Sequence, residues 1–328
     1  MLDRVTRAIL DRQIRVVGVL AKSWALREWY ADLLYSLPLA GLCSAIIAFV
    51  VIRLLRRNTG LDHDLRLGIG RDQLKLEYQP IIDLDSGRCV AAEALLRWQH
   101  PVHGYVRPDL FIPLAEDTGL IGPLTEWVVR RVLREQEPLL RRFPDFRLSI
   151  NCPTSLLVSG GLEQILRRVM VAPQLATHLV FEVTEHVFVG QGVDTLREAM
   201  SRLRRAGFRF ALDDFGTGYS SFDHLTKLEF EFLKIDRCFV QAIGASEAST
   251  SIFDTLVNLA ATLGMVTVAE GVETDEQGRH VKRRGVSLAQ GWLFGMPLPI
   301  SEFAQHWSEA RSGDSRRPDR RAHAAVGH

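Results

Sequence analysis

Residues 209–214 read RFALDD, an apolar run that ends in two adjacent aspartates, Asp213 and Asp214. Successive side chains of a β-strand point to opposite faces, so both carboxylates can serve one site only at the end of a strand. Like charges gathered this closely repel each other unless cations lie among them. The segment therefore predicts a buried strand whose carboxyl end borders a charged site.

Seven other apolar segments have the length of a strand, and amphipathic helical patterns lie between most of them. The eight predicted strands are Leu74–Leu84, Cys89–Trp98, Phe146–Cys152, His178–Glu185, Arg209–Asp214, Phe232–Asp236, Thr267–Gly271 and Ser287–Trp292. The predicted helices include Leu124–Leu140, Ser155–Val169, Asp194–Ala206, Ser251–Leu263 and Asp275–Arg284.

Eight strands in about 220 residues is the number that a (β/α)8 barrel requires. The first two strands are joined only by Asp85, Ser86 and Gly87, which indicates a hairpin rather than a helical crossover. We therefore expect an α/β fold, a TIM-like (β/α)8 barrel with an antiparallel first strand.

The composition excludes some classes of protein. Of the 328 residues, 47% are hydrophobic and 24% are charged, which is ordinary for a globular protein. The formal net charge of +1 is spread along the chain, so nothing indicates a partner among DNA or RNA polymers. The four cysteines form no CxxC pair, so we expect neither a disulfide framework nor a zinc site.

The segment Leu33–Ile52 contains no charged residue, and it is as long as an α-helix must be to cross a bilayer. Arg53, Arg56 and Arg57 follow it, which suits a helix end in the headgroup region. We therefore expect one transmembrane helix before the barrel; the alternative is a buried core helix. The preceding segment Met1–Asp32 is also basic, so charge alone leaves the orientation open.

These features divide the chain into five parts. They are a short N-terminal segment over 1–32, the transmembrane helix over 33–55, a linker over 56–70, the barrel domain over 71–310 and a disordered tail over 311–328.

Acidic side chains recur within the predicted strands and at their carboxyl ends. They are Glu93, Glu182, Glu185, Asp213, Asp214, Asp236, Glu270 and Glu273, accompanied by Asn151 and Lys234. Ionised carboxylates in apolar strands are costly unless they are paired or bound to metal, and the carboxyl ends of barrel strands meet at one mouth. Taken alone, Glu93 could instead pair with Arg97, and Lys234 could neutralise a nearby aspartate.

Together these residues predict an oxygen-rich site for two divalent cations, Mg²⁺ or Mn²⁺. Two such ions can stabilise both the attacking and the leaving oxygen of a phosphodiester displacement.

Seven segments, in matching order, resemble the motifs of the EAL-domain family. They are YQPIIDL from Tyr78, EALLRWQHP from Glu93, FEVTE from Phe181, LDDFGTGYSSF from Leu212, LKIDRCFV from Leu233, VAEGVET from Val268 and QGWLFGMPLP from Gln290. The family is named for the tripeptide represented here by Glu93, Ala94 and Leu95, and the likeness covers Arg71 to Trp307.

The resemblance implies an enzyme that hydrolyses cyclic di-GMP to linear pGpG with Mg²⁺ or Mn²⁺. It implies that one cation is held by Glu93, Asn151, Glu182 and Asp213, and a second by Asp213, Asp214 and Glu270. The catalytic residues would be Glu270, Lys234 and Glu93, with Glu270 as the general base and Lys234 orienting the attacking water.

The resemblance also implies a set of residues around the substrate and a homodimer formed through the barrel. The substrate-binding residues would be Gln79, Arg97, Asp236, Glu273 and Gln290. Glu185 would stabilise the loop after LDDF, where Gly216 and Gly218 give the backbone freedom. Departures from the family pattern at Cys152, Pro153, Glu231 and Met296 remove no implied metal ligand.

Two functions are compatible with these motifs: an active phosphodiesterase, or a catalytically silent receptor that binds cyclic di-GMP and signals through the membrane helix. Receptors of this kind usually lack a metal ligand, and the complete set here favours the enzyme. For either function we expect a single-pass protein of the bacterial inner membrane, anchored through residues 33–52, with its catalytic domain in the cytoplasm.

Overall fold

The computed structural model describes residues 8–10, 13–15, 37, 40–51, 60–169, 173–185, 193–216, 225 and 227–311. The chain divides into two units, residues 1–63 and 64–328. In the first unit, strands β1 (Ala8–Leu10) and β2 (Gln13–Arg15) form an antiparallel pair, and residues 40–51 are helical. Residues 60–70, within the segment expected to be a linker, form a helix.

Of the membrane span expected over residues 33–55, only residue 37 and residues 40–51 lie among the described residues. Among the helices that the structure describes, none combines the length and the apolar character needed to cross a bilayer. The described part of the chain therefore gives no support to the predicted span.

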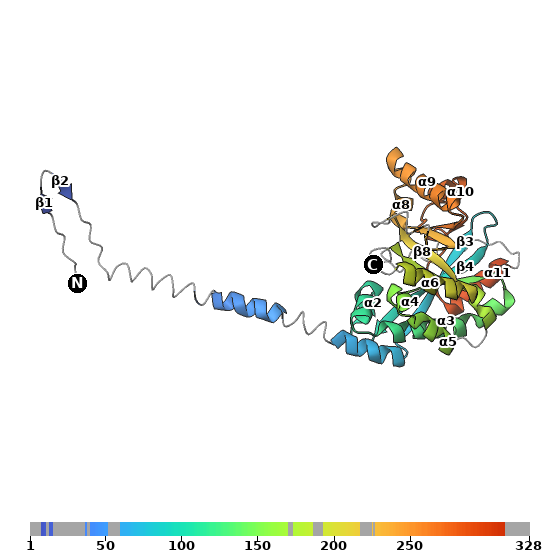
Figure 1. The fold of residues 1–328 in the computed structure, drawn as a ribbon, viewed down its shortest axis with the longest axis horizontal. Helices are drawn as coiled ribbons and strands as arrows, with labels where there is room; N and C mark the ends of the chain where they lie inside the picture. Colours follow the sequence, from blue (N-terminus) through green and yellow to red (C-terminus); the bar gives the residue numbers. More distant parts are fainter. Residues whose placement is uncertain are drawn as a thin grey trace. The chain divides into compact units, whose positions relative to one another are not determined.

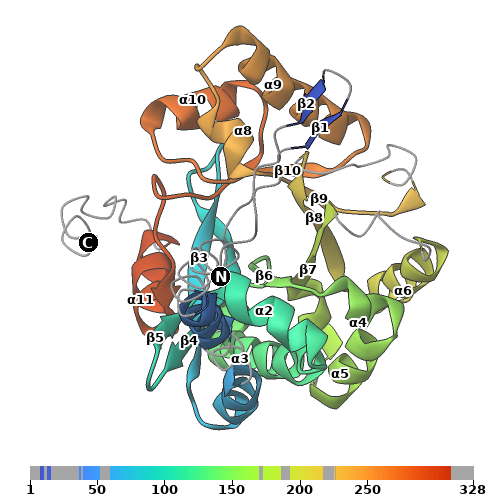
Figure 2. The same cartoon turned by 90° about the vertical axis from the view of Figure 1, so that its left-hand side faces the viewer.

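The second unit contains a closed barrel of eight strands (Figure 2). Neighbours around the barrel are β3, β11, β10, β9, β8, β7, β6 and β4, and pairing of β3 with β4 closes the ring. Their bounds are β3 Leu74–Asp83, β4 Cys89–His100, β6 Arg147–Asn151, β7 Leu179–Thr184, β8 Arg209–Phe215, β9 Phe232–Ile235, β10 Val266–Ala269 and β11 Leu288–Ala289. The predicted eight-stranded barrel is confirmed.

Strand β3 runs antiparallel to both of its barrel neighbours, β4 and β11, whereas the six other neighbouring pairs are parallel. The predicted hairpin joins β3 to β4, and Asp83 Oδ1 accepts hydrogen bonds from Ser86 N and Oγ in its turn, both at 2.7 Å. Two short strands extend the sheet antiparallel to this hairpin: β5 (Gly104–Val106) pairs with β4, and β12 (Leu298–Pro299) pairs with β3.

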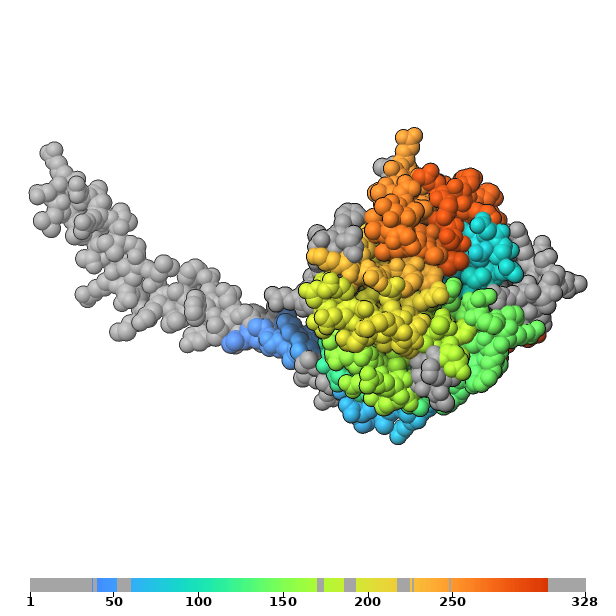
Figure 3. All heavy atoms as spheres, turned by 45° about the vertical axis from the view of Figure 1, so that its right-hand side comes forward, coloured from blue at the N-terminus to red at the C-terminus, as the bar shows by residue number. Residues whose placement is uncertain are grey.

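Helices surround the barrel, with α9 and α10 on one side and α3 to α5 on the opposite side (Figures 1 and 3). Their bounds are α2 Pro108–Asp117, α3 Ile121–Arg142, α4 Thr154–Val158, α5 Gly161–Val169, 3-10 helix η1 Pro173–His178, α6 Val193–Arg205, α8 Arg237–Gln241, α9 Glu247–Thr262, α10 Asp275–Arg283 and α11 Ile300–Arg311.

Two helices differ from the prediction for local reasons. The helix expected over Ser155–Val169 is split into α4 and α5, because Gly160 has a left-handed backbone with φ of 73°. Helix α9 begins at Glu247, four residues before the expected start, where the Ser246 hydroxyl accepts a hydrogen bond from Ser249 N as an N-cap.

The barrel has two apolar regions. The outer faces of the strands pack against the helices in a large core that includes fully buried Phe181 and Phe210. A smaller cluster of inward-facing residues, which we call the interior plug, consists of Ile81, Ala91, Val180, Ala211, Phe232, Val268 and Leu288. Polar side chains on the inner face therefore lie at one or the other end of the barrel.

Candidate functional site

Most of the predicted site residues lie on the inner face of the barrel, because strand side chains alternate between its two faces. Each lies two positions from a member of the interior plug or, for Asn151, from buried Ser149. The pairs are Ile81 and Gln79, Ala91 and Glu93, Ser149 and Asn151, Val180 and Glu182, Ala211 and Asp213, Phe232 and Lys234, Val268 and Glu270, and Leu288 and Gln290. This regular spacing brings them together at the carboxyl mouth.

Lys234 is the centre of this group. Its Nζ atom lies 2.7 Å from Glu270 Oε1, 2.8 Å from Glu182 Oε2, 3.0 Å from Asp213 Oδ1 and 3.4 Å from Glu93 Oε2. The lysine side chain is 3% exposed, so these charges interact in a region that water hardly reaches. The lysine therefore joins four carboxylates from four different strands or strand ends.

Two side-chain amides fix the orientation of the Glu93 carboxylate. Asn151 Nδ2 donates to Glu93 Oε1 at 3.2 Å, and Gln290 Nε2 donates to Glu93 Oε2 at 2.7 Å. Gln79 is paired with Glu93 across the β3–β4 hairpin, and its Nε2 donates to the Gly295 carbonyl at 3.4 Å.

The acidic groups at this mouth resist full ionisation. Burial and the neighbouring Glu93 raise the pKa of Glu182 well above its ordinary value. Burial also raises the pKa of Glu270 to about 8, with Lys234 opposing the shift and Asp213 adding to it. Burial and the adjacent Asp213 raise the pKa of Asp214 to about 6.

Lys234 and Glu93 keep their charges. Burial alone would lower the pKa of Lys234, but Asp213 and the surrounding glutamates raise it well above its ordinary value. Burial alone would raise the pKa of Glu93, but the attraction of Lys234 and the hydrogen bond from Gln290 hold it below its ordinary value.

The adjacent aspartates reach one site because the strand is irregular at that point. The pairing of β8 with β9 shifts register between Leu212 and Phe215, and Asp214 has a left-handed backbone with φ of 55°. This conformation is uncommon for residues other than glycine and is typical of functional sites. As a result, carboxylate oxygens of Asp213, Asp214 and Glu270 all lie within 4.8 Å of one another.

These residues fit hard divalent cations. Four carboxyl groups surround one ammonium group, and the carboxyl group of Asp214 lies beside two of them, so the fully ionised site has an excess of negative charge. Among the described residues, Glu182 Oε1 and Gln290 Oε1 are buried oxygens that accept no hydrogen bond. Carboxylate and amide oxygens are the ligands that Mg²⁺ and Mn²⁺ prefer, so cations would balance the charge and satisfy the free oxygen of Glu182.

The alternative pairing of Glu93 with Arg97 is wrong. Arg97 Nε instead donates to Glu77 Oε2 at 2.7 Å, and both side chains are partly exposed. Glu77 is nearer because it lies on the neighbouring strand β3, whereas the Glu93 carboxylate turns into the barrel toward Lys234.

The remaining predicted residues lie at the rim of the mouth. Asp236 Oδ1 caps α8 by accepting from Cys238 N at 2.8 Å, and Glu273 Oε1 accepts from Gln241 Nε2 at 3.1 Å. Glu185 Oε2 accepts from Gly216 N at 2.7 Å, at the start of the loop that Glu185 was expected to stabilise. Gly218, also assigned to that loop, lies outside the described residues.

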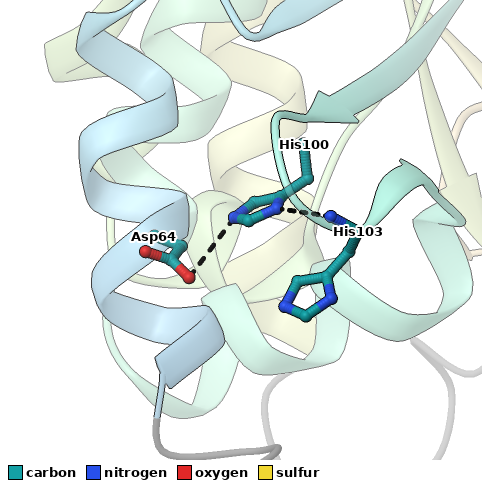
Figure 4. A group of neighbouring side chains, drawn as sticks. All are labelled: Asp64, His100 and His103. Atoms are coloured by element: carbon teal, nitrogen blue, oxygen red, sulfur yellow. Dashed lines mark hydrogen bonds and ion pairs between the residues drawn. The ribbon is translucent and has the colours of Figure 1, made fainter.

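A second group of possible metal ligands, not predicted from the sequence, consists of Asp64, His100 and His103 (Figure 4). The only signal in the sequence was the close spacing of the two histidines in HPVH. His100 is buried, its Nδ1 atom accepts hydrogen bonds from Val102 N and His103 N, and its Nε2 atom lies 3.3 Å from Asp64 Oδ2.

Two backbone N–H donors on Nδ1 require that nitrogen to be unprotonated, so the proton of the neutral ring is on Nε2 and points at Asp64. No ring nitrogen of His100 is then free for a metal. The group is a structural contact between the helix over residues 60–70 and the end of β4.

Comparisons with known proteins agree with this geometry. The sequence pattern described as "EAL domain" matches residues 62–297. The chain is 37% identical over 284 residues to "Probable cyclic di-GMP phosphodiesterase PdeB" of Escherichia coli, covering 86% of this chain and 54% of PdeB. It is 39% identical over 247 residues to the cyclic di-GMP phosphodiesterase NbdA of Pseudomonas aeruginosa, covering 75% of this chain and 31% of NbdA. The chain thus spans about half the length of these relatives, or less.

Solved structures share the fold. The PaMucR phosphodiesterase in complex with c-di-GMP superposes with a TM-score of 0.67 at 36% identity, covering 74% of this chain and 98% of that one. The EAL enzyme Bd1971, bound to cAMP and cyclic di-GMP, superposes with a TM-score of 0.71 at 26% identity, covering 90% of this chain and 81% of that one.

Proposed function

Because the chain belongs to the EAL domain family, we propose that it is a phosphodiesterase that hydrolyses cyclic di-GMP to linear pGpG. The observation that carries the proposal is the cluster of Glu93, Glu182, Asp213 and Glu270 around buried Lys234. Such a concentration of buried carboxylates destabilises a fold unless it serves to hold cations.

Two divalent cations, Mg²⁺ or Mn²⁺, would complete the site. The residues that would hold them are Glu93, Asn151, Glu182 and Asp213 for one ion, and Asp213, Asp214 and Glu270 for the other. When bound, such a pair of ions stabilises charge on the attacking and the leaving oxygens of a phosphodiester.

The side chains of the chain itself contribute in three ways. Glu270 would act as the general base toward the attacking water, in the ionised form that cation binding requires. Lys234 keeps the surrounding carboxylates in place and would orient the attacking water. The two amides on Glu93 prevent that carboxylate from turning away.

The substrate would be held at the rim of the mouth by Gln79, Arg97, Asp236, Glu273 and Gln290. The guanidinium of Arg97 suits a phosphate oxygen, and its Nε donates a hydrogen bond to Glu77 on the neighbouring strand β3.

Turnover by the full-length protein tests the proposal. The wild type with Mn²⁺ should convert cyclic di-GMP to pGpG, identified by mass spectrometry, and Glu93→Gln should reduce the rate to background. Glu198→Gln, the same change at an exposed position of α6, is the matched control and should keep the wild-type rate. Binding of cyclic di-GMP without any product from the wild type would favour the silent receptor instead.

We also propose a homodimer formed through the barrel, as the family resemblance implies. Light scattering on the detergent-solubilised full-length protein should give the mass of two chains, and a monomer at micromolar concentration would contradict it.

We further propose that residues 33–52 anchor the protein in the bacterial inner membrane with the barrel in the cytoplasm. Support comes from the sequence, in which these twenty positions carry no charge. The expressed protein should stay with the membrane fraction after alkaline carbonate washing, and its release would refute the anchor.

A further inference from the structure

The end of the barrel opposite the catalytic mouth has a cavity of about 790 Å³. It is lined by the first residues of several strands, including Arg147 of β6, Arg209 of β8 and Val266 of β10. A cavity of this size is typical of small-molecule sites. None of the residues assigned to the cyclic di-GMP site lines it.

Two arginines face this cavity without a carboxylate partner. Arg147 and Arg209 are each two positions before an inner-face residue, Ser149 and Ala211, so both point inward. Their strands flank β7, so the backbones are about 10 Å apart, a separation that two long guanidinium side chains can bridge around one anion. Among the described residues, neither guanidinium has a carboxylate within 4.0 Å.

The third arginine of the cavity is already paired. Arg204 forms ion pairs with both Glu229 and Glu231, so these carboxylates do not neutralise Arg147 or Arg209. Arg147 instead lies over the ring of Phe232, 5.8 Å from its centroid. Burial and the nearby Arg209 lower the pKa of Arg147, and only exposed Asp145 opposes this shift.

The interior plug separates this cavity from the catalytic mouth. Phe232 and Leu288 of the plug line the cavity, and Lys234 and Gln290 follow two positions later on the catalytic side. The cavity lining includes four carboxyl groups beside its three arginines. Glu229 and Glu231 pair with Arg204, and Asp83 accepts hydrogen bonds from Ser86 in the hairpin turn, so Arg147 and Arg209 remain the two guanidinium groups available to an anion.

We propose that this cavity binds a small phosphate monoester, with the phosphate between Arg147 and Arg209 and the organic part against Leu228 and Met265. A pair of guanidinium groups gives charge-assisted hydrogen bonds to phosphate oxygens, and apolar lining favours an attached organic group over inorganic phosphate. The inference is independent of the hydrolysis proposed for the other end.

Calorimetric titration of the full-length protein in EDTA with phenyl phosphate and with inorganic phosphate tests the site. Without cations the acidic catalytic mouth repels anions, so binding reports the opposite end with Arg147 and Arg209. Phenyl phosphate should bind more tightly than inorganic phosphate, and Arg147→Gln and Arg209→Gln should each weaken binding at least about 10-fold. Arg167→Gln, on the outer helix α5, is the matched control and should bind as the wild type does.

A labelling experiment on the wild type tests the same site even if the arginine variants fail to fold. Phenylglyoxal modification of the wild type, mapped by mass spectrometry, should slow at Arg147 and Arg209 when phenyl phosphate is present, while Arg167 reacts at an unchanged rate. The proposal is overturned if the wild type shows no saturable binding of phenyl phosphate up to about 10 mM ligand. It is also overturned if bound phenyl phosphate protects neither arginine from phenylglyoxal.

Discussion

Removal of the Lys234 ammonium group should destabilise the protein strongly unless divalent cations replace its charge. In Lys234→Met, four carboxylates within 3.4 Å of the lost Nζ atom have no buried cation. Each ionised pair at this range is worth about 5 kcal/mol at an effective dielectric of 20, before the desolvation of the ammonium group is subtracted. Removal of one partner from a buried pair costs about 3–5 kcal/mol in measured cases, and we expect a loss in this range.

The penalty should depend on pH and on cations. At pH 8 in EDTA a loss of about 3–5 kcal/mol should appear, whereas at pH 5.5 it should shrink, because Glu270, with a pKa raised to about 8, is largely protonated there. Mn²⁺ at about 100 times its dissociation constant should restore about 2.7 kcal/mol.

Urea unfolding of the full-length protein, followed by circular dichroism, measures these differences. Lys75→Met, an exposed lysine on β3, is the matched control and should change stability by less than about 0.5 kcal/mol. A loss below about 1 kcal/mol at pH 8 in EDTA, or an equal loss at both pH values, would refute the reasoning.

Three further outcomes are expected. Glu270 and Asp214, with pKa values raised to about 8 and about 6, must lose protons to bind a cation. Mn²⁺ should therefore bind more tightly at pH 8 than at pH 6 and release at least about one proton at pH 7; calorimetry in two buffers of different ionisation enthalpy checks this, and pH-independent binding would contradict it. Gly291→Ala should cost more than about 3 kcal/mol in urea unfolding, because its Cβ would lie 2.2 Å from the Val272 carbonyl oxygen, whereas Gly285→Ala, with positive φ but open space, should cost about 1 kcal/mol; equal losses would disprove the steric argument. Asp64→Ala should cost about 1 kcal/mol and leave the bound metal content unchanged by elemental analysis, and a loss of metal would show that His100 is a ligand.

Much of the site could be predicted because the inner face of each strand repeats every second residue. FEVTE and FALDD place Glu182 and Asp213 two positions after Val180 and Ala211, so alternation alone brings their carboxylates to the same face and the same end. The hairpin at Asp85 likewise followed from a connection too short for a helix.

Other features depend on tertiary structure that alternation does not specify. Strict alternation would send the Asp214 carboxylate away from that of Asp213, and only the register shift with β9 and the left-handed backbone of Asp214 bring them together. The choice of Glu77 rather than Glu93 as the partner of Arg97 depends on cross-strand geometry. Arg147 and Arg209 at the opposite end follow the same two-residue spacing, but their lack of a carboxylate partner is visible only in three dimensions.

The reversed direction of β3 decides where the chain enters the barrel. In an all-parallel barrel the first strand would begin at the end remote from the reacting groups, but here Leu74 pairs with Trp98, beyond Glu93 on β4. The helix ahead of it contacts the same neighbourhood through Asp64 and His100. Any mechanical or conformational input that travels down the polypeptide from upstream therefore arrives beside the chemistry, without having to pass through the rest of the domain.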